Sequence, residues 1–392
     1  MELRTGFVDH LKQHYPALSA ILDERPELIS ENLLSPFHVT LPRSILPQIE
    51  AAVQSVQELR HRLSSEHNAQ SGHDFPNPGN QSTMMSLDFH LDEKDQLKLI
   101  EINTNAAFLI MGWEMYRFRG LQNPVQSFTP ERWKADLAEE LKSNRDHFGK
   151  GPAPESPLVA ISDDEPEQQR LFIEFLVAQE WIRSWGWQAD IRDFKNVTSD
   201  PRPDVVYNRS TDFYLAQPQS SKARESFMSG ETCFSPNPFE YSLLADKERM
   251  IEWSRPGFLE SLGLSPESLQ VLKDIVPVCV DLSRDTADEL WARRKQLFFK
   301  AKREFGSKKA FRGASISRKV FDEMTGEDML AQEFIPPREI EFPSPEGPIK
   351  LKYDLRCHFY QGRLEGVLAR LYQGQVTNLK TPYGGFTPVV FE

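Results

Sequence analysis

The stretch 85–108 constrains the fold most, because its pattern is that of a β-hairpin. Two runs, 86–91 and 97–103, alternate apolar and polar residues, and the five residues between them are all polar. This pattern predicts two short strands that are joined by a tight turn and pair with each other.

The same hairpin carries oxygen donors at one end. Side chains two residues apart on a strand share a face, so Glu101 and Asn103 should converge, with Asp88 on the neighbouring strand. Carboxylate and carboxamide oxygens are the ligands that Mg²⁺ prefers. The hairpin is therefore a candidate seat for Mg²⁺ bridged to nucleotide phosphates. The alternative is a surface hairpin with scattered acids.

The composition narrows the class of protein. A chain of 392 residues is long enough for two or three domains, and its formal net charge of −12 argues against a general nucleic-acid or anionic-membrane binder. The three cysteines are far apart in the sequence, which favours reduced thiols in the cytoplasm over a disulfide framework or a zinc site. No segment approaches the ~20 apolar residues of a membrane span, and the first residues lack the apolar core of a secretory signal.

The first half of the chain divides into two parts. Stretch 41–67 has apolar residues at intervals of three and four, which predicts an amphipathic helix before the hairpin. A Gly- and Pro-rich linker, 149–157, then opens a strand–helix–strand pattern typical of an open parallel α/β sheet. No GxGxxG follows its first strand, so nicotinamide or flavin binding is not supported. Arg209 and Asp212 follow the third strand, where such sheets bind ligands, although a solvated loop is the alternative.

A second chemical cluster is basic. Residues 296–300 predict a strand that delivers Lys300, and the loop 302–313 behind it contains glycines and several cations. A glycine-bearing loop can present backbone N–H groups to phosphate, and lysine adds a point charge. Gly306 and Ser307 are the candidate loop contacts, and Lys302 competes with Lys300 as the main phosphate contact. A basic surface hairpin is the alternative when this stretch is taken alone.

The last quarter of the chain adds three more blocks. An apolar stretch ends at Pro336-Pro337, and its last residues, Gln332, Glu333, Phe334 and Ile335, can offer backbone groups to an adenine edge. Glu339 just beyond can accept from ribose hydroxyls. Two alternating strands then carry Arg356 and Arg370, which suit phosphate binding. A glycine-bearing tail follows, with Asn378.

Together these blocks resemble the ATP-grasp superfamily. The matching stretches are FFKAKREFGSKKAFRG, AQEFIPP, KYDLR with LARLYQG, TNLKTPYGGF, and LDFH with LIEINTN, and they cover about half of the chain. The run from KYDLR to GGF is similar to bacterial glutathione synthetases. The order differs from the usual one, because the metal hairpin precedes the lysine strand by some two hundred residues. The sequence therefore resembles a circularly permuted ATP-grasp protein, whose two ends should lie close together.

The resemblance implies an α/β (α+β) fold in four segments. Residues 1–148 would be the permuted C-terminal part of the ATP-grasp domain with the metal hairpin, and 155–245 a Rossmann-like pre-ATP-grasp domain. Residues 246–335 would form the central subdomain with the glycine loop, and 336–392 the rest of the C-terminal subdomain.

The resemblance also assigns roles to residues. Lys247 and Lys300 match the phosphate lysines, residues 332–335 the adenine linker, Glu339 the ribose acid, and Asp88, Glu101 and Asn103 the Mg²⁺ ligands. Arg356 and Arg370, with Asn378, match catalytic positions, and Arg209 is a weaker candidate for substrate binding. Some ligases of this type have arginine two residues before the first metal aspartate, whereas this chain has Ser86.

The family chemistry would be an ATP- and Mg²⁺-dependent, ADP-forming ligation. A small-molecule or peptide carboxylate would form an acyl phosphate, and an amine would then displace phosphate. The alternatives are a small-molecule kinase on the same fold and a nucleotide-binding protein without turnover. Nucleic acid and membrane are not expected partners. Ligases of this kind are often dimers, so a homodimer stays open.

Overall fold

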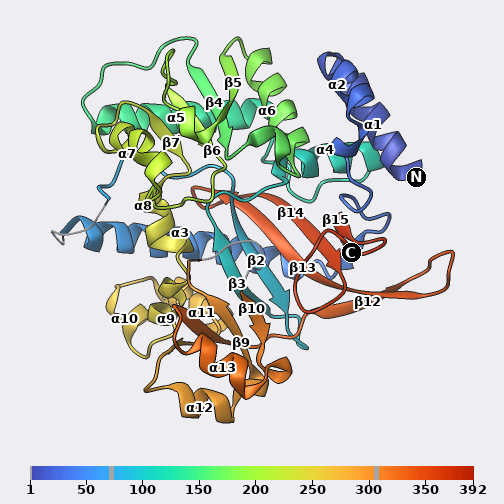
Figure 1. Ribbon diagram of the computed structural model, residues 1–392, viewed down its shortest axis with the longest axis vertical. Coiled ribbons are helices and arrows are strands. Elements are labelled where there is room, and N and C mark those ends of the chain that lie inside the picture. The colour runs from blue at the N-terminus through green and yellow to red at the C-terminus, as the bar shows by residue number, and fades with distance from the viewer. Residues whose placement is uncertain (1, 70–74, 304–308) are drawn as a thin grey trace.

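The computed structural model describes residues 2–69, 75–303 and 309–392. In these ranges the strands form three sheets: a large mixed sheet, a parallel sheet and a small antiparallel sheet. Figure 1 shows the large sheet in the middle of the molecule, with the parallel sheet above it and the small antiparallel sheet below. The chain therefore has a mixed α/β fold, as the sequence predicted.

The large sheet combines strands from both ends of the chain. Its order is β1 (Val39–Leu41), β15 (Gly385–Phe391), β14 (Arg363–Tyr372), β13 (Ile349–Tyr360), β2 (Met85–Leu91) and β3 (Leu97–Asn103), and β12 (Arg338–Phe342) pairs with an extension of β13. β1 runs parallel to β15, and Arg43 and Glu392 join through a backbone hydrogen bond. The N- and C-terminal parts of the chain thus lie side by side (Figure 1).

The predicted hairpin forms strands β2 and β3, but β3 contains a bulge. Phe89 pairs with Leu99 and Asp88 with Glu101, which leaves Ile100 as an extra residue on β3. Leu97, Leu99 and Ile102 are buried, whereas Glu101 and Asn103 lie on the other face. A strict alternation would have put Glu101 on the same side as Leu99. The bulge is the local feature that turns the acidic end of β3 away from the hydrophobic core.

Helix α3 (Ile45–Ala69) covers one face of the large sheet. Its apolar residues Ile49, Val53 and Val56 are fully buried and belong to the same core cluster as Leu87 and Leu355. The helix begins at Ile45 rather than at the predicted residue 41, because residues 39–41 pair with β15 as strand β1.

Helix α4 (Leu109–Arg119) packs against the other face of the large sheet. A side chain at Gly112 would meet Leu368 of β14, because a Cβ atom there would lie 2.6 Å from Leu368 Cδ1. The same face carries the polar row Asp354, Arg356 and His358 on β13, all buried. The functional candidates on the sheet therefore lie opposite α3.

The parallel sheet has the order β5 (Gln188–Asp193), β4 (Leu158–Asp163), β6 (Val205–Asn208) and β7 (Cys233–Ser235), and all three pairings are parallel. Its helices are α5 (Pro130–His147), α6 (Phe172–Ser184) and α7 (Ser221–Met228). The strand–helix–strand pattern of the sequence thus gave the correct local fold. Helices α1 (Glu2–His14) and α2 (Ser19–Glu24) lie in the same part of the molecule (Figure 1).

The small antiparallel sheet has the order β10 (Ala310–Arg312), β9 (Leu297–Ala301), β11 (Met329–Glu333) and β8 (Cys279–Leu282). Its helices are α9 (Glu248–Trp253), α10 (Phe258–Ser261), α11 (Pro266–Ile275), α12 (Ala287–Ala292) and α13 (Arg318–Met324). In the part of the chain that the structure describes, no helix combines the length and the apolar character that a bilayer crossing requires.

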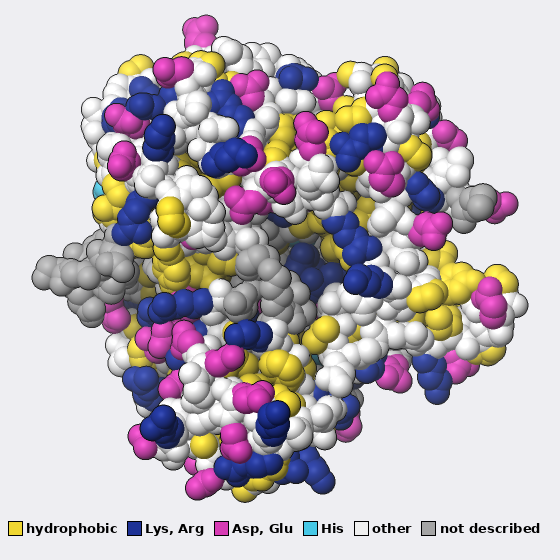
Figure 2. Space-filling model, viewed as in Figure 1, with side chains coloured by type: hydrophobic (Ala, Val, Ile, Leu, Met, Phe, Trp, Pro, Cys, Tyr) yellow, Lys and Arg dark blue, Asp and Glu magenta, His cyan; other side chains and the backbone are white. Residues whose placement is uncertain are grey.

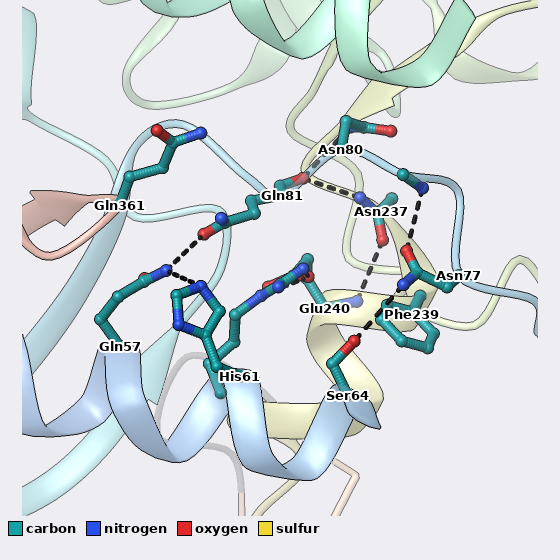
Figure 3. A network of polar contacts seen from close by, with 12 residues as sticks. Gln57, His61, Ser64, Asn77, Asn80, Gln81, Asn237, Phe239, Glu240 and Gln361 are labelled. Carbon is teal, nitrogen blue, oxygen red and sulfur yellow. Dashed lines mark hydrogen bonds and ion pairs between the residues drawn. The ribbon is translucent and has the colours of Figure 1, made fainter. Parts of the chain in front are cut away.

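A buried ion pair connects helix α3 to the short segment 237–245. Arg60 on α3 donates from Nε to the two carboxylate oxygens of Glu240, at 3.0 and 3.2 Å, and Nη2 adds a further bond. Glu240 ends helix α8 (Pro238–Glu240), which Asn237 caps, and Asn237 also donates to the Gln81 carbonyl (Figure 3). The next residues, Tyr241–Ala245, form a single π-helical turn. The network therefore fixes the start of a segment that reaches the candidate site.

Candidate functional site

A cavity of about 540 Å³ lies where the large sheet meets the small antiparallel sheet and loops of the parallel unit. Figure 2 shows a hollow in the middle of the molecule, with Lys and Arg side chains inside it. The volume lies within the range that is typical of small-molecule sites.

Most of the sequence-predicted residues line this one cavity. They come from both sequence clusters: Glu101, Asn103, Lys247, Lys300, Gln332, Glu333, Phe334, Ile335, Arg356, Arg370 and Asn378. The two clusters are some two hundred residues apart in the sequence, and the fold brings them together.

Glu101 and Asn103 present different groups to the cavity. Among the described residues, the Glu101 carboxylate has no hydrogen-bond or ion-pair partner. The Asn103 amide donates from Nδ2 to Ser86 Oγ at 3.4 Å and to Asp88 Oδ2 at 3.2 Å. The carbonyl oxygen of that amide accepts from no described residue. One carboxylate and one carboxamide oxygen are thus available for a cation.

Asp88 does not line the cavity. It is 1% exposed, and both of its oxygens bind arginine: Oδ1 accepts from Arg356 Nε at 3.0 Å, and Oδ2 from Arg356 Nη2 at 2.7 Å and Arg370 Nη2 at 2.8 Å. Burial raises the pKa of Asp88, but the two arginines outweigh that effect and hold it below the ordinary value.

Asp354 completes the network around the arginines. It accepts from Arg370 Nε at 2.7 Å and from Nη2 at 3.0 Å, and it pairs with Arg370 in the β13–β14 register. Burial lowers the pKa of Arg370, but Asp354 and Asp88 more than compensate, so its guanidinium stays charged. In the described ranges, the Nη1 atoms of both arginines have no hydrogen-bond partner. Each arginine therefore keeps one nitrogen for a ligand.

Lys300 connects the small antiparallel sheet to the hairpin. Its Nζ donates to the carbonyl oxygen of Ile100, the bulge residue, at 2.9 Å. Burial lowers the pKa of Lys300, and Glu101 partly opposes that shift. The hydrogen-bond partner of Lys300 is a neutral carbonyl, so its ammonium group is suited to bind an anion such as phosphate.

Lys302, the alternative to Lys300 as the main phosphate contact, does not line the cavity. Strand β9 ends at Ala301, and Lys302 turns toward Asp281 at 2.7 Å, Asp328 at 3.0 Å and Glu248 at 3.7 Å. Burial lowers the pKa of Lys302, but its bonds to Asp281 and Asp328 raise it overall. Lys302 ties the end of β9 to its neighbours and does not line the cavity.

The predicted adenine linker lies at one end of the cavity. Gln332 donates from Nε2 to the Leu99 carbonyl at 3.3 Å, and His90 donates from Nδ1 to the Ile335 carbonyl at 2.8 Å. The rings of Phe298 and Phe334 stack with centroids 6.3 Å apart, and both line the cavity. A flat aromatic ligand fits such a wall.

Other predicted residues are not brought to the cavity. Glu339 is exposed on β12, opposite Lys352, because the chain leaves the cavity after Pro337. Arg209 is buried behind the wall and donates from Nη1 to the carbonyl oxygens of Asn105 and Ala106, at 2.6 and 2.8 Å. It therefore supports the segment 104–107 rather than facing a ligand. Asp212 is buried and caps its own loop. Gly306 and Ser307 lie outside the described residues.

Sequence reasoning missed several wall residues. Asp354 had a signal, since it stands two residues before Arg356 on an alternating strand. His90 lies on the predicted hairpin, but a lone histidine on a strand does not by itself indicate a binding site. Phe213 and Tyr241, whose rings stack at 4.2 Å, had no signal, because their meeting depends on the π-helical turn and on packing between units.

Comparisons with known proteins rest on structure. The sequence matches no protein-family model and no curated protein. A glutathione synthetase-like effector from Globodera pallida, solved in its apo form, is 12% identical and aligns over 96% of this chain and 97% of its own, with a TM-score of 0.57. A protein from Methylobacillus flagellatus described as a gamma-glutamylcysteine synthetase is 10% identical, with coverage of 86% and 84% and a TM-score of 0.42. The first of these two matches shows that the chain has the fold of the glutathione synthetase-like effector.

Proposed function

We propose that this protein is an ATP-dependent, ADP-forming carboxylate–amine ligase on a circularly permuted ATP-grasp fold. The observation that supports this most is the common cavity of Glu101 and Asn103 with Lys300, Arg356 and Arg370. Each set supplies what the other lacks, since acidic oxygens suit a divalent cation and the cations suit phosphate.

The residues present fit ATP and Mg²⁺. The stacked rings of Phe298 and Phe334 and the linker 332–335 suit the adenine ring of ATP. Lys300 and Lys247 suit the phosphates of ATP. Glu101 and Asn103 would hold Mg²⁺, because each has an oxygen without a partner among the described residues. Mg²⁺ bound there would neutralise charge on the transferred phosphoryl group.

The reaction needs positioned charge more than covalent help from the protein. A carboxylate oxygen of the first substrate attacks the γ-phosphorus, and the bond to ADP breaks, which gives an acyl phosphate. The amine of the second substrate attacks the acyl carbon, phosphate leaves, and the amine nitrogen loses a proton. Arg356 and Arg370 offer cationic N–H groups to the oxygens that gain charge. No nucleophilic side chain is needed.

Product analysis tests this proposal. Purified protein with Mg-ATP and pooled candidate acids and amines should release ADP and phosphate only when both substrate types are present. Release of AMP and pyrophosphate would contradict the mechanism. A stable phosphorylated product without free phosphate would instead indicate a kinase on the same site.

A further inference from the structure

The position of Asp88 differs from that of an open metal ligand. Five donors surround its carboxylate: Oδ1 accepts from Ser86 Oγ at 3.0 Å and from Arg356, and Oδ2 accepts from Arg356, Arg370 and Asn103. A carboxylate offers about four lone-pair directions, so these contacts occupy its acceptor capacity. Glu101, one strand away, has no such partner among the described residues.

We propose that Asp88 is a positioning residue: it holds Arg356 and Arg370 so that one nitrogen of each remains for the ligand, and it leaves cation binding to Glu101 and Asn103. This inference rests on the proposed function, because it assigns a role within the same nucleotide site.

The register of the large sheet supports this role. Asp88 on β2 lies directly opposite Glu101 on β3 and directly opposite Arg356 on β13, so it separates the acidic residue from the basic ones. Arg370 reaches the same carboxylate from β14, one strand farther away. A cation on Asp88 would have to displace both guanidinium groups.

That displacement would be costly because of burial. Arg356 is 8% exposed, and its carboxylate partner is Asp88. Without Asp88, a charged guanidinium would be left buried with its compensating charge removed. In the observed network the charges balance, since Asp88 and Asp354 face Arg356 and Arg370.

Asp88 also orients the carboxamide of Asn103. The amide donates from Nδ2 to Asp88 and Ser86, which leaves its carbonyl oxygen available to coordinate a cation. Side chains that bind a metal are commonly oriented by hydrogen bonds to neighbouring groups that do not touch the metal. Asp88 thus acts on the cation site without occupying it.

The test separates metal coupling from phosphate binding. ATP dissociation constants are measured by calorimetry for wild type, Asp88→Asn and Glu101→Gln, each with excess Mg²⁺ and with EDTA. We expect Asp88→Asn to weaken ATP binding by roughly tenfold or more in both conditions, because the carboxylate that holds both guanidinium groups in position is lost. The ratio of the ATP dissociation constant in EDTA to that in excess Mg²⁺ should stay within about twofold of the wild-type ratio. Glu101→Gln should bring that ratio close to one.

If the ratio also falls close to one in Asp88→Asn, then Asp88 is a metal ligand and the inference is wrong. An unchanged ATP affinity in Asp88→Asn would also overturn it. If wild type itself binds no ATP, the proposed function fails, which is a separate outcome. Should Asp88→Asn not fold, Asp88→Asn/Arg370→Gln removes one charge of each sign, and the same ratio decides. Adenosine affinity, which depends on the linker end of the cavity, is the control and should not change.

Discussion

Lys300 donates a hydrogen bond to the backbone carbonyl of Ile100 over 2.9 Å, although two hundred residues separate them in the chain. The acceptor is the extra residue of a β-bulge, and the donor is a partly buried lysine of the small antiparallel sheet. This contact joins the acidic and the basic halves of the candidate site.

The lowered pKa of Lys300 gives a pH dependence. Burial favours its neutral form, so Lys300 loses its proton, and with it the attraction for phosphate, below the ordinary value of 10.5. ATP affinity should therefore fall as pH rises toward that value. Lys300→Met should bind ATP roughly tenfold more weakly at neutral pH and show less of this decline. Calorimetry between pH 7 and 10 checks both, with adenosine as the reference ligand. An identical decline in Lys300→Met would contradict the assignment.

Lys302 should behave in the opposite way. Its ammonium group binds Asp281 and Asp328, both of which are about half exposed, and does not line the cavity. Lys302→Met should lower the free energy of unfolding by about 1–2 kcal/mol, because it leaves two carboxylates close to each other. Urea denaturation measures that loss. ATP affinity of the folded protein should remain within about twofold of wild type. A large loss of ATP affinity would restore Lys302 as the phosphate lysine.

The bulge itself can be removed. Deletion of Ile100 leaves the alternating series Leu97, Lys98, Leu99, Glu101, so the strand can pair regularly and still present Glu101 to the cavity. The variant should keep its fold but lose the carbonyl that accepts from Lys300 and Gln332. We expect ATP affinity to fall by roughly tenfold. Circular dichroism and calorimetry are the measurements, and undiminished ATP affinity would show that the bulge is not needed.

The Arg60–Glu240 pair should support stability. Glu240 is fully buried, so Arg60→Met leaves its charge without compensation and should cost about 3–5 kcal/mol of unfolding free energy. Arg60→Met/Glu240→Leu removes both charges and should recover a large part of this loss. Urea denaturation of the two variants tests the difference. Equal destabilisation by the single and double variants would mean that packing, not charge, dominates.

Much of the site was predictable from the sequence because it rests on strands. Alternation on β13 and β14 predicted the face that carries Arg356 and Arg370, and the two-residue spacing of Glu101 and Asn103 predicted that these two share a face. The pairing of the strands then brings both pairs to one cavity. The bulge at Ile100 was not predictable from period alone, since it changes the phase of β3 midway. Strict alternation would have buried Glu101.

Several of the predicted residues that do not line the cavity lie where strands end. Lys302 follows β9 by one residue, and the turn there decides its direction, so its spacing from Lys300 was misleading. Glu339 follows the linker, but β12 carries it away from the cavity. Arg209 follows β6 and turns inward to hold residues 105 and 106. These directions depend on tertiary contacts that the local sequence does not encode.

The central claim is that one nucleotide site is built from Glu101 and Asn103 on one side and Lys300, Arg356 and Arg370 on the other. A crystal structure with Mg²⁺ and a non-hydrolysable ATP analogue tests it most directly. We expect the triphosphate between these two sets of residues, with the adenine against Phe334. A nucleotide bound outside this cavity would contradict it.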